Sequence, residues 1–434
     1  MSDFYTNLTL IGDDVLYRGY EDGKPVQYRE RTKPVMYLVP GAQKKPSKYK
    51  TLDGRMAYPK QFDGAREARN FLKQYENAAG LEVHGYERFL YQHIAQKFTS
   101  DVDYDMTKMK IYTIDIEVAC ENGFPDVEAS AEEMLCITIK DFNTKKIVTW
   151  GTREYQSKHE YRVFWTEAEM LEDFVGWWVQ NTPDIITGWN CNLYDIPYIC
   201  RRVERILGEK WKKSLSPWKR VYDREIVIQG RTNIAYDITG VNILDYLDLY
   251  KKFTYTNQES YRLDHIAMVE LDDKKLDHSE YENFKDFYTN DWDRFVEYNI
   301  HDVDLVDQLE DKMKLIELCV AMAYDAKVNF TDVYSQVRVW DTLIYNDLSK
   351  INVVVPPKSR TKKDDKYAGA YVKEPKPGIY DWVVSFDLNS LYPHLIMQYN
   401  ISPETLVERR HPTATVEGLL NRRIRIDGDF AVCA

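Results

Sequence analysis

The chain has 434 residues, of which 44% are hydrophobic and 29% charged, which is the composition of a folded protein with about two to four domains. The formal net charge of −12 excludes a uniformly basic nucleic-acid-binding surface but leaves room for a local basic groove. No apolar run approaches the roughly 18 residues of a membrane-spanning helix, no signal peptide is evident, and the six cysteines lack zinc-site spacing, so we expect reduced thiols and a cytoplasmic location.

Residues 1–108 are predicted to form an N-terminal domain of short strands, with helices near 64–79 and 87–97. From residue 109 to 325 the pattern changes to α/β, and a mixed sheet flanked by helices is expected. The predicted elements are strands at 110–118, 134–140, 146–150 and 184–189, helices at 166–181 and 195–207, a hairpin at 226–244 about Gly230, and long helices over 291–325.

The last part of the chain is predicted to hold two further segments. Residues 326–378 are interpreted as a return to the N-terminal domain followed by a linker, and residues 379–434 as the beginning of another domain with a strand at 380–387.

Basic residues gather in two clusters, and each is either a DNA-binding groove or an ordinary solvated surface. The first cluster comprises Arg201, Arg202, Arg205, Lys210, Lys212, Lys213, Lys219, Arg220 and Arg224. The second comprises Lys358, Arg360, Lys362, Lys363 and Lys366.

Two acidic side chains stand on the first strand of the α/β region. Side chains alternate between the faces of a strand, so Asp115 and Glu117 should share one face while Ile114, Ile116 and Val118 point into a core. Neighbouring carboxylates beside a core are costly unless divalent cations compensate them, and oxygen ligands suit Mg²⁺. The alternative is an edge strand with a solvated acidic face.

Two later segments supply further acidic residues. Asp195 follows an apolar strand and a short polar turn, and it is either a metal ligand or a helix N-cap. The turn contains Asn190, which is a candidate substrate contact. Tyr298 and Asp302 are spaced i, i+4 in a predicted helix and therefore face the same side. A helical Asp commonly points to water, which is the alternative for Asp302.

Together these residues resemble the DEDD exonucleases that also carry a tyrosine, and the resemblance implies a ribonuclease-H-like fold with two-metal 3′→5′ hydrolysis of DNA. Asp115 would bridge two Mg²⁺ ions, Glu117 and Asp302 would hold the ion on the nucleophile side, and Asp195 would hold the other, mostly through water. Tyr298 would orient the attacking water, because a phenol with a pKa near 10 is a poor base at neutral pH.

Residues 381–393 read DWVVSFDLNSLYP and resemble the first catalytic motif of the family B DNA polymerases. By that resemblance Asp387 binds metal ions, the Leu388 carbonyl adds a ligand, and Leu391 and Tyr392 contact the nucleotide, with Tyr392 under the sugar. The alternative for Asp387 is a helix N-cap. Segment 243–253 also resembles this family, and the hairpin at 226–244 would help to separate primer from template.

The resemblance is incomplete toward the end of the chain. In KYAGAY at 366–371, Ala370 departs from the second glycine of the family's YxGG element, and His394 stands where a serine is usual. The KxxxNSxYG and DTDS motifs do not occur. We therefore expect either the first half of a split polymerase, which we favour, or an incomplete sequence. Expected partners are primer-template and single-stranded DNA and a second chain that carries the missing motifs, with deoxynucleoside triphosphates bound only in that complex.

The resulting hypothesis is a proofreading exonuclease joined to a partial polymerase palm. The alternative is a catalytically idle module that binds or docks nucleic acid. The presence of all four exonuclease carboxylates and of Tyr298 favours the enzyme.

Overall fold

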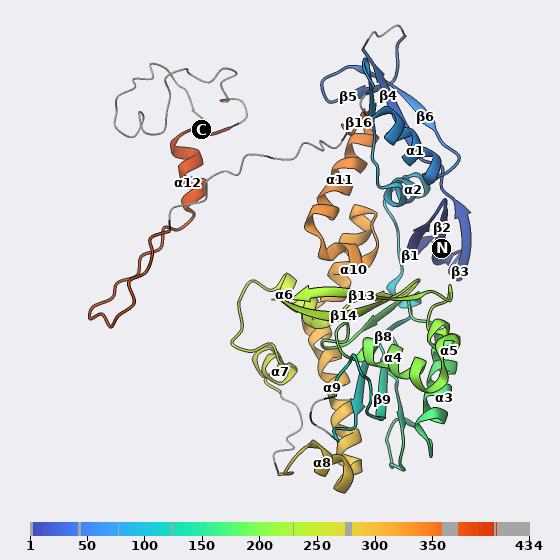
Figure 1. Cartoon of the computed structure of the whole chain (residues 1–434), viewed down its shortest axis with the longest axis vertical. Helices are drawn as coiled ribbons and strands as arrows, with labels where there is room; N and C mark the ends of the chain where they lie inside the picture. The colour runs from blue at the N-terminus through green and yellow to red at the C-terminus, as the bar shows by residue number, and fades with distance from the viewer. Residues whose placement is uncertain are drawn as a thin grey trace. The chain divides into compact units, whose positions relative to one another are not determined.

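The structure is a computed structural model that describes residues 3–41, 45–76, 78–121, 123, 125–228, 230–273, 280–357, 372–402 and 405. The chain divides into two compact units, Met1–Arg360 and Thr361–Ala434, which are considered separately (Figure 1). Among the described residues, no helix combines the length and the apolar character that a membrane crossing requires.

The first unit begins with a three-stranded antiparallel sheet and a five-stranded mixed sheet. One is the meander β1-β2-β3, and the other has the strand order β16-β5-β6-β4-β7. Strand β16, Val353–Val354, runs parallel to β5, so the chain returns to this sheet after the intervening residues have folded elsewhere. The other elements here are β1 (Phe4–Ile11), β2 (Asp14–Glu21), β3 (Lys24–Arg31), β4 (Val35–Pro40), β5 (Tyr49–Thr51), β6 (Met56–Gln61), β7 (Leu81–His84), α1 (Ala65–Tyr75) and α2 (Phe89–Lys97).

A six-stranded mixed sheet forms the centre of the α/β region, with the order β11-β10-β9-β8-β12-β15. Strand β8 pairs antiparallel with β9 and parallel with β12, which confirms the predicted mixed sheet. Its strands are β8 (Ile111–Val118), β9 (Met134–Asp141), β10 (Ile147–Gly151), β11 (Glu160–Val163), β12 (Ile185–Thr187) and β15 (Asn242–Ile243).

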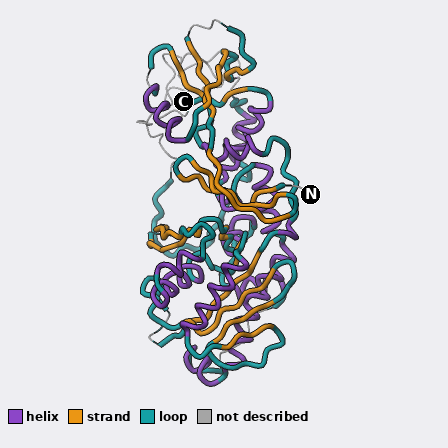
Figure 2. Tube along the Cα trace, turned by 90° about the vertical axis from the view of Figure 1, so that its right-hand side faces the viewer, coloured by secondary structure: helices purple, strands orange, loops and turns teal. Residues whose placement is uncertain are grey.

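The two faces of this sheet are covered by different helices. Ile114, Ile116 and Val118 are buried in one cluster with residues of α3 (Glu167–Asn181) and α4 (Asp195–Leu207), as their alternation predicts. On the opposite face, α9 (Trp292–Met313) runs beside β8 and β9 (Figures 1 and 2). The side chains of β8 that alternate with the core residues therefore face α9.

The remaining helices complete the first unit. They are η1 (Met106–Lys108), α5 (Glu209–Ser214), α6 (Tyr246–Phe253), α7 (Leu263–Leu271), α8 (Phe284–Asn290), α10 (Leu315–Ala326), η2 (Phe330–Tyr334) and α11 (Gln336–Lys350). The helical stretch predicted over 291–325 is thus two helices, because Lys314 adopts a left-handed conformation between α9 and α10.

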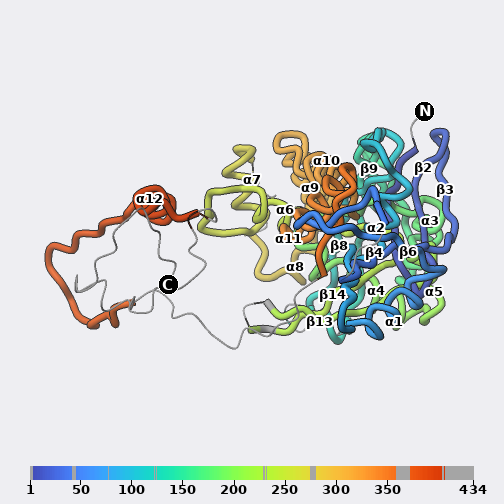
Figure 3. The backbone as a smooth tube through the Cα atoms, turned by 90° about the horizontal axis from the view of Figure 1, so that it is seen from above, coloured from blue at the N-terminus to red at the C-terminus, as the bar shows by residue number. Residues whose placement is uncertain are grey.

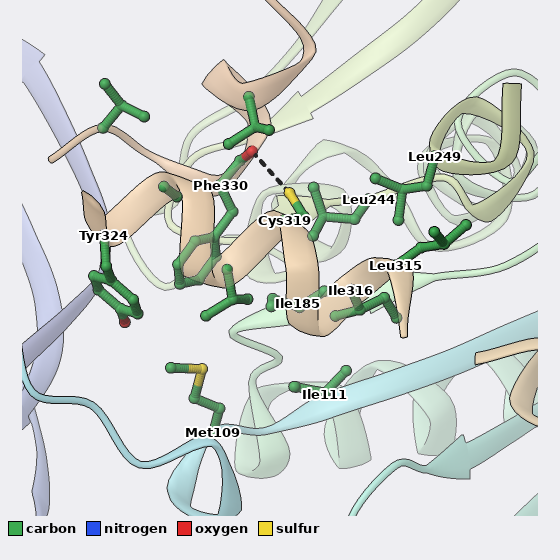
Figure 4. Close-up of a cluster of buried hydrophobic side chains, with 14 of the residues drawn as sticks. Met109, Ile111, Ile185, Leu244, Leu249, Leu315, Ile316, Cys319, Tyr324 and Phe330 are labelled. Atoms are coloured by element: carbon green, nitrogen blue, oxygen red, sulfur yellow. Dashed lines mark hydrogen bonds between the residues drawn. The ribbon is translucent and has the colours of Figure 1, made fainter. Parts of the chain in front are cut away.

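One hydrophobic cluster joins the N-terminal strands, the central sheet and the late helices. In Figure 4, Cys319 of α10 lies among residues such as Ile111, Ile185 and Leu244, and its Sγ donates to the Phe330 carbonyl at 3.4 Å. Tyr5 of β1 also enters this cluster. Since one core serves all three regions, Met1–Arg360 forms a single compact unit.

The hairpin is present, but its bounds differ from those predicted. It consists of β13 (Val221–Ile228) and β14 (Arg231–Ile238), and it extends beside the rest of its unit (Figure 3). Residues 242–243 belong to the central sheet instead. The hairpin was predicted to begin too late because the polar residues 222–225 show no pattern typical of a strand. In the structure, eight cross-strand pairs fix its register, from Val221↔Ile238 to Ile228↔Arg231.

The strand predicted at 380–387 is wrong. These residues have no strand assignment, and the segment is followed by helix α12, Leu391–Gln398. The apolar run that suggested a buried strand is exposed, with Trp382 at 98% and Phe386 at 89%. A strand requires a hydrogen-bonded neighbour, and none pairs with this segment within 372–402.

Three arginines of the first basic cluster hold a loop of the protein itself. Arg201, Arg202 and Arg205 on α4 donate to carbonyl oxygens within residues 128–131, at 2.8, 2.9 and 3.0 Å respectively. These contacts favour a structural role for the three residues over a DNA-binding groove, and Arg202 is buried rather than solvated. The second cluster, from Lys358 to Lys366, lies outside the described residues, as does the segment 367–371.

Candidate active site

Two acidic side chains of β8 and one of α9 converge. One carboxylate oxygen from each of Asp115, Glu117 and Asp302 lies within 4.8 Å of the others. Glu117 and Asp302 are buried, at 9% and 3% exposure. The strand alternation that sends Ile114 and Ile116 into the core brings the two β8 carboxylates to the α9 side, where Asp302 meets them.

Tyr298 lies one helical turn before Asp302, on the same side of α9. The tyrosine is 9% exposed and packs edge-on against Phe284 and Phe287, with ring centroids 6.4 and 6.0 Å away. Its neighbours fix the ring, and the residue also lines the pocket that contains Asp302. The i, i+4 spacing therefore places both side chains where the sequence predicted them.

Asp195 is the first residue of α4 and lies in the same pocket, but it is not a member of the carboxylate triad. Its Oδ1 accepts a hydrogen bond from the Ile116 backbone N–H at 3.0 Å. The N-cap position belongs to Tyr194, so the interpretation of Asp195 as a helix cap is wrong. Asp195 instead binds the backbone of β8 between the two β8 carboxylates.

Asn299 is a site residue that the sequence did not reveal. Its Nδ2 donates to Asp115 Oδ2 at 2.7 Å, and its Oδ1 accepts from Cys136 Sγ at 3.4 Å. Asn299 and Cys136 are both fully buried. The available signal was a polar residue beside Tyr298 in an amphipathic helix, but nothing in the sequence pairs position 299 with strand β8.

The pocket around these side chains has a volume of about 1260 Å³. Its wall contains both carboxylates and aromatic residues, among them Trp189, Tyr261 and Phe284. Asn190, in a left-handed conformation with φ of 65°, also lines it. Flat rings suit the bases of a nucleic acid, whereas carboxylates can face its phosphates only with cations between them.

The donor set fits a divalent metal ion. Carboxylate oxygens are hard ligands, and three of them held together in a partly buried pocket repel one another unless a cation lies between them. Burial adds to the cost of the negative charges. These three residues are therefore suited to hold a divalent cation, and they are three of the four exonuclease carboxylates predicted from sequence.

The residues predicted for the polymerase motif all lie in the second unit. Asp387 is exposed, and so are Leu388, Leu391 and Tyr392, at 69%, 42% and 74%. Helix α12 begins after Ser390, which takes the N-cap position, so the interpretation of Asp387 as an N-cap is wrong. Among the described residues, Asp387 belongs to no group of acidic side chains that could hold an ion.

Comparisons with known proteins agree with this geometry. Residues 87–266 match the exonuclease domain of DNA polymerase family B, and residues 329–429 match DNA polymerase family B. The DNA-directed DNA polymerases of Escherichia phage RB69 and Enterobacteria phage T4 are 34% and 35% identical to this chain over 94% of its length.

Each of these matches covers 48% of the phage protein, so the chain spans about half the length of those relatives. The DNA polymerase catalytic subunit of human herpesvirus 7 is 30% identical over 68% of this chain and 31% of the viral protein. The six-stranded sheet with its flanking helices fits the ribonuclease-H-like fold predicted for the exonuclease domain. The chain belongs to the family B DNA polymerases, with their exonuclease domain and part of their polymerase domain.

Proposed function

We propose that this chain hydrolyses the 3′-terminal phosphodiester of DNA in the 3′→5′ direction, using Mg²⁺. The observation that carries the proposal is the convergence of Asp115, Glu117 and Asp302 within 4.8 Å, beside Tyr298 and Asp195 in one pocket. Phosphodiester hydrolysis is very slow without catalysis, and barrier reductions on the order of 20 kcal/mol are needed. Preorganised charges around the reacting phosphate are the largest source of such a reduction.

We assign a separate role to each residue of the site. Two Mg²⁺ ions, when bound, would supply a hydroxide nucleophile and stabilise the leaving 3′ oxygen. Asp115 would bridge them, Glu117 and Asp302 would complete the nucleophile side, and Asp195 would act on the other side mostly through water. Tyr298 would donate or accept a hydrogen bond to orient the attacking water, since its packing against two phenylalanines fixes the ring.

Single-stranded DNA is the substrate that the pocket favours. Trp189 and Phe284 offer apolar ring faces on which unpaired bases can stack, and Asn190 offers an amide for a base or sugar. Stacking contributes about 1–3 kcal/mol per base without sequence preference. A proofreading role follows, because a frayed primer end presents unpaired bases.

We propose that residues 379–434 are the beginning of a polymerase palm and do not polymerise alone. Asp387 would be one of two carboxylates needed for metal binding, with the Leu388 carbonyl as a further ligand, while Leu391 and Tyr392 would contact the deoxynucleoside triphosphate. Together with the second carboxylate motif, which residues 379–434 lack, they would bind primer-template in the cytoplasm of an infected host. The alternative, an idle nucleic-acid-binding module, predicts DNA binding without cleavage.

The test uses the full chain and a single-stranded oligonucleotide labelled at its 5′ end. With Mg²⁺ we expect a ladder of labelled products that shorten one nucleotide at a time, and no products with chelator or with Asp115→Ala. Asp347→Asn is the matched control, since Asp347 is a surface acid of α11 that pairs with Lys350 at 3.1 Å. Binding of the oligonucleotide without any cleavage would establish the alternative.

A further inference from the structure

We propose that Asp245 is a positioning residue of the exonuclease site, whose carboxylate holds the loop that precedes Asp195. The inference rests on the proposed exonuclease function, and it assigns a role to a segment, 243–253, whose sequence pointed to the family but to no function. Asp245 touches neither the carboxylate triad nor the pocket. It would act through the backbone of residues 190–192.

Three backbone N–H groups from two segments converge on this carboxylate. Its Oδ1 accepts from Asn190 at 3.0 Å and from Leu247 at 3.0 Å, and its Oδ2 accepts from Asn192 at 2.9 Å. The side chain therefore uses one oxygen to cap helix α6 and both oxygens to fasten the loop. Hydrogen bonds to an ionised acceptor are stronger than those between neutral groups, so this loop is held more firmly than by backbone pairing alone.

The position is costly for a carboxylate, which suggests that the contacts matter. Asp245 is only 2% exposed, and the largest effect of a nearby charge on it comes from another acid, Asp248. Burial, followed by the nearby charge of Asp248, raises the pKa of Asp245 to about 7, while the three N–H groups act in the opposite direction. An unpaired buried acid destabilises a fold, so a neutral side chain would be preferred if capping α6 were its only role.

The loop connects this carboxylate to the reacting side of the site. Asn190 adopts a left-handed conformation, and its carbonyl accepts from the backbone N–H of Leu193 and Tyr194, which turns the chain into α4. Asp195 then follows directly and accepts from Ile116 on β8, between Asp115 and Glu117. A shift of residues 190–192 would be transmitted to Asp195 within three residues.

The next residue ties the same segment to helix α9. Tyr246 donates its hydroxyl to Glu310 Oε2 at 3.0 Å, and its backbone N–H donates to the Gly188 carbonyl at 2.9 Å. Glu310 is 1% exposed on the helix that also carries Asp302. Residues 245–246 thus contact both the loop that leads to Asp195 and the helix that supplies the third carboxylate of the triad.

Asp245→Ser separates a capping role from a positioning role. Serine is as good an N-cap as aspartate, so α6 keeps its first hydrogen bond, but a single hydroxyl cannot reach Asn190 and Asn192 together. Asp248→Asn is the matched control, because Asp248 is a neighbouring acid of α6 that makes no hydrogen bond to the loop. Both variants remove one negative charge from the same region.

The experiment measures cleavage and loop protection on the full chain. In single-turnover assays with a single-stranded oligonucleotide and saturating Mg²⁺, we expect Asp245→Ser to lower the rate constant at least tenfold and Asp248→Asn to change it less than twofold. By hydrogen exchange without metal, we expect peptides covering 188–194 to exchange faster in Asp245→Ser, while peptides of α6 and of β8 keep their wild-type protection.

The exchange measurement is independent of cleavage, so it remains decisive even if the wild-type chain proves inactive, which would refute the proposed function instead. Unchanged protection of 188–194 would overturn the inference. Faster exchange throughout α6 and the core would also overturn it, because the residue would then be serving general stability.

Discussion

Asn299 donates its side-chain amide to Asp115 Oδ2 at 2.7 Å, from a position on α9 that is one residue from Tyr298. The amide cannot reorient freely, because its oxygen accepts from the buried thiol of Cys136 on β9. Cys136 is itself suited to donate, since burial and the nearby Glu117 raise the pKa of its thiol and keep it protonated. The carboxylate of Asp115 is thus oriented by the amide of a neighbouring helix.

Replacing Asn299 by alanine should weaken the site without unfolding the protein. Removing the partner of a metal-binding side chain typically costs about 10–100-fold in metal affinity or activity. We expect a loss of that size in kcat, and a higher Mg²⁺ concentration for half-maximal cleavage, with KM for the oligonucleotide nearly unchanged. Isothermal titration with Mg²⁺ in the absence of DNA provides a second readout.

Cys136 offers a graded control for this prediction. Cys136→Ser retains a donor toward Asn299, whereas Cys136→Ala removes it, so activity should fall in the order wild type, Ser, Ala. Equal activity of the alanine and serine variants would show that the thiol does not orient the amide.

Stability should depend on pH through Asp245. Its pKa is about 7 in the folded protein, against about 4 for an aspartate in an unfolded chain. Between about pH 4 and 7 the folded state therefore binds more protons than the unfolded state. The contribution of this group to the free energy of unfolding is largest below that range and is lost as the pH rises through 7.

Through this group, the free energy of unfolding should fall by at most about 1.4 kcal/mol per pH unit. This fall should be absent in Asp245→Asn, because asparagine does not titrate. Urea denaturation of both proteins at about pH 5 and about pH 8 measures it. A difference between wild type and variant that stays constant across the two pH values would contradict the assigned pKa.

The central features of the site were predictable because they follow local rules. Alternation along β8 places Asp115 and Glu117 on one face, and the i, i+4 spacing places Tyr298 with Asp302. Asn299 and Asp245 were not predictable, because each acts across a tertiary contact that no local pattern encodes. The strand expected at 380–387 failed for a related reason, since an apolar run indicates a strand only where a neighbouring strand can pair with it.

Asp184 should be the main polar support between the N-terminal sheet and the central sheet. It is 3% exposed and accepts hydrogen bonds from Thr6 and Tyr20 at 2.9 Å each and from the Lys110 backbone at 3.0 Å. Arg18 pairs with it at 3.2 Å. Asp184→Ala would leave that arginine buried without its charge partner, and breaking a buried pair in this way costs about 3–5 kcal/mol.

Chemical denaturation measures this loss directly, and Asp304→Ala serves as a comparison, because Asp304 is 32% exposed and shares Lys140 with Asp307. We expect the comparison variant to lose about 1 kcal/mol or less, because Lys140 keeps its second partner, Asp307. Similar losses for both variants would refute the view that Asp184 holds the two sheets together.

The hydroxyl of Tyr298 and its ring should have separable effects. Tyr298→Phe keeps the edge-on contacts with Phe284 and Phe287, so the unfolding free energy should change little. Tyr298→Ala removes a buried aromatic ring, which costs about 3–5 kcal/mol. If the hydroxyl orients the attacking water, both variants should lose activity at saturating DNA and Mg²⁺, although only the alanine variant loses stability. Single-turnover cleavage and urea denaturation of the same preparations decide this, and a phenylalanine variant that cleaves at the wild-type rate would leave Tyr298 with a packing role alone.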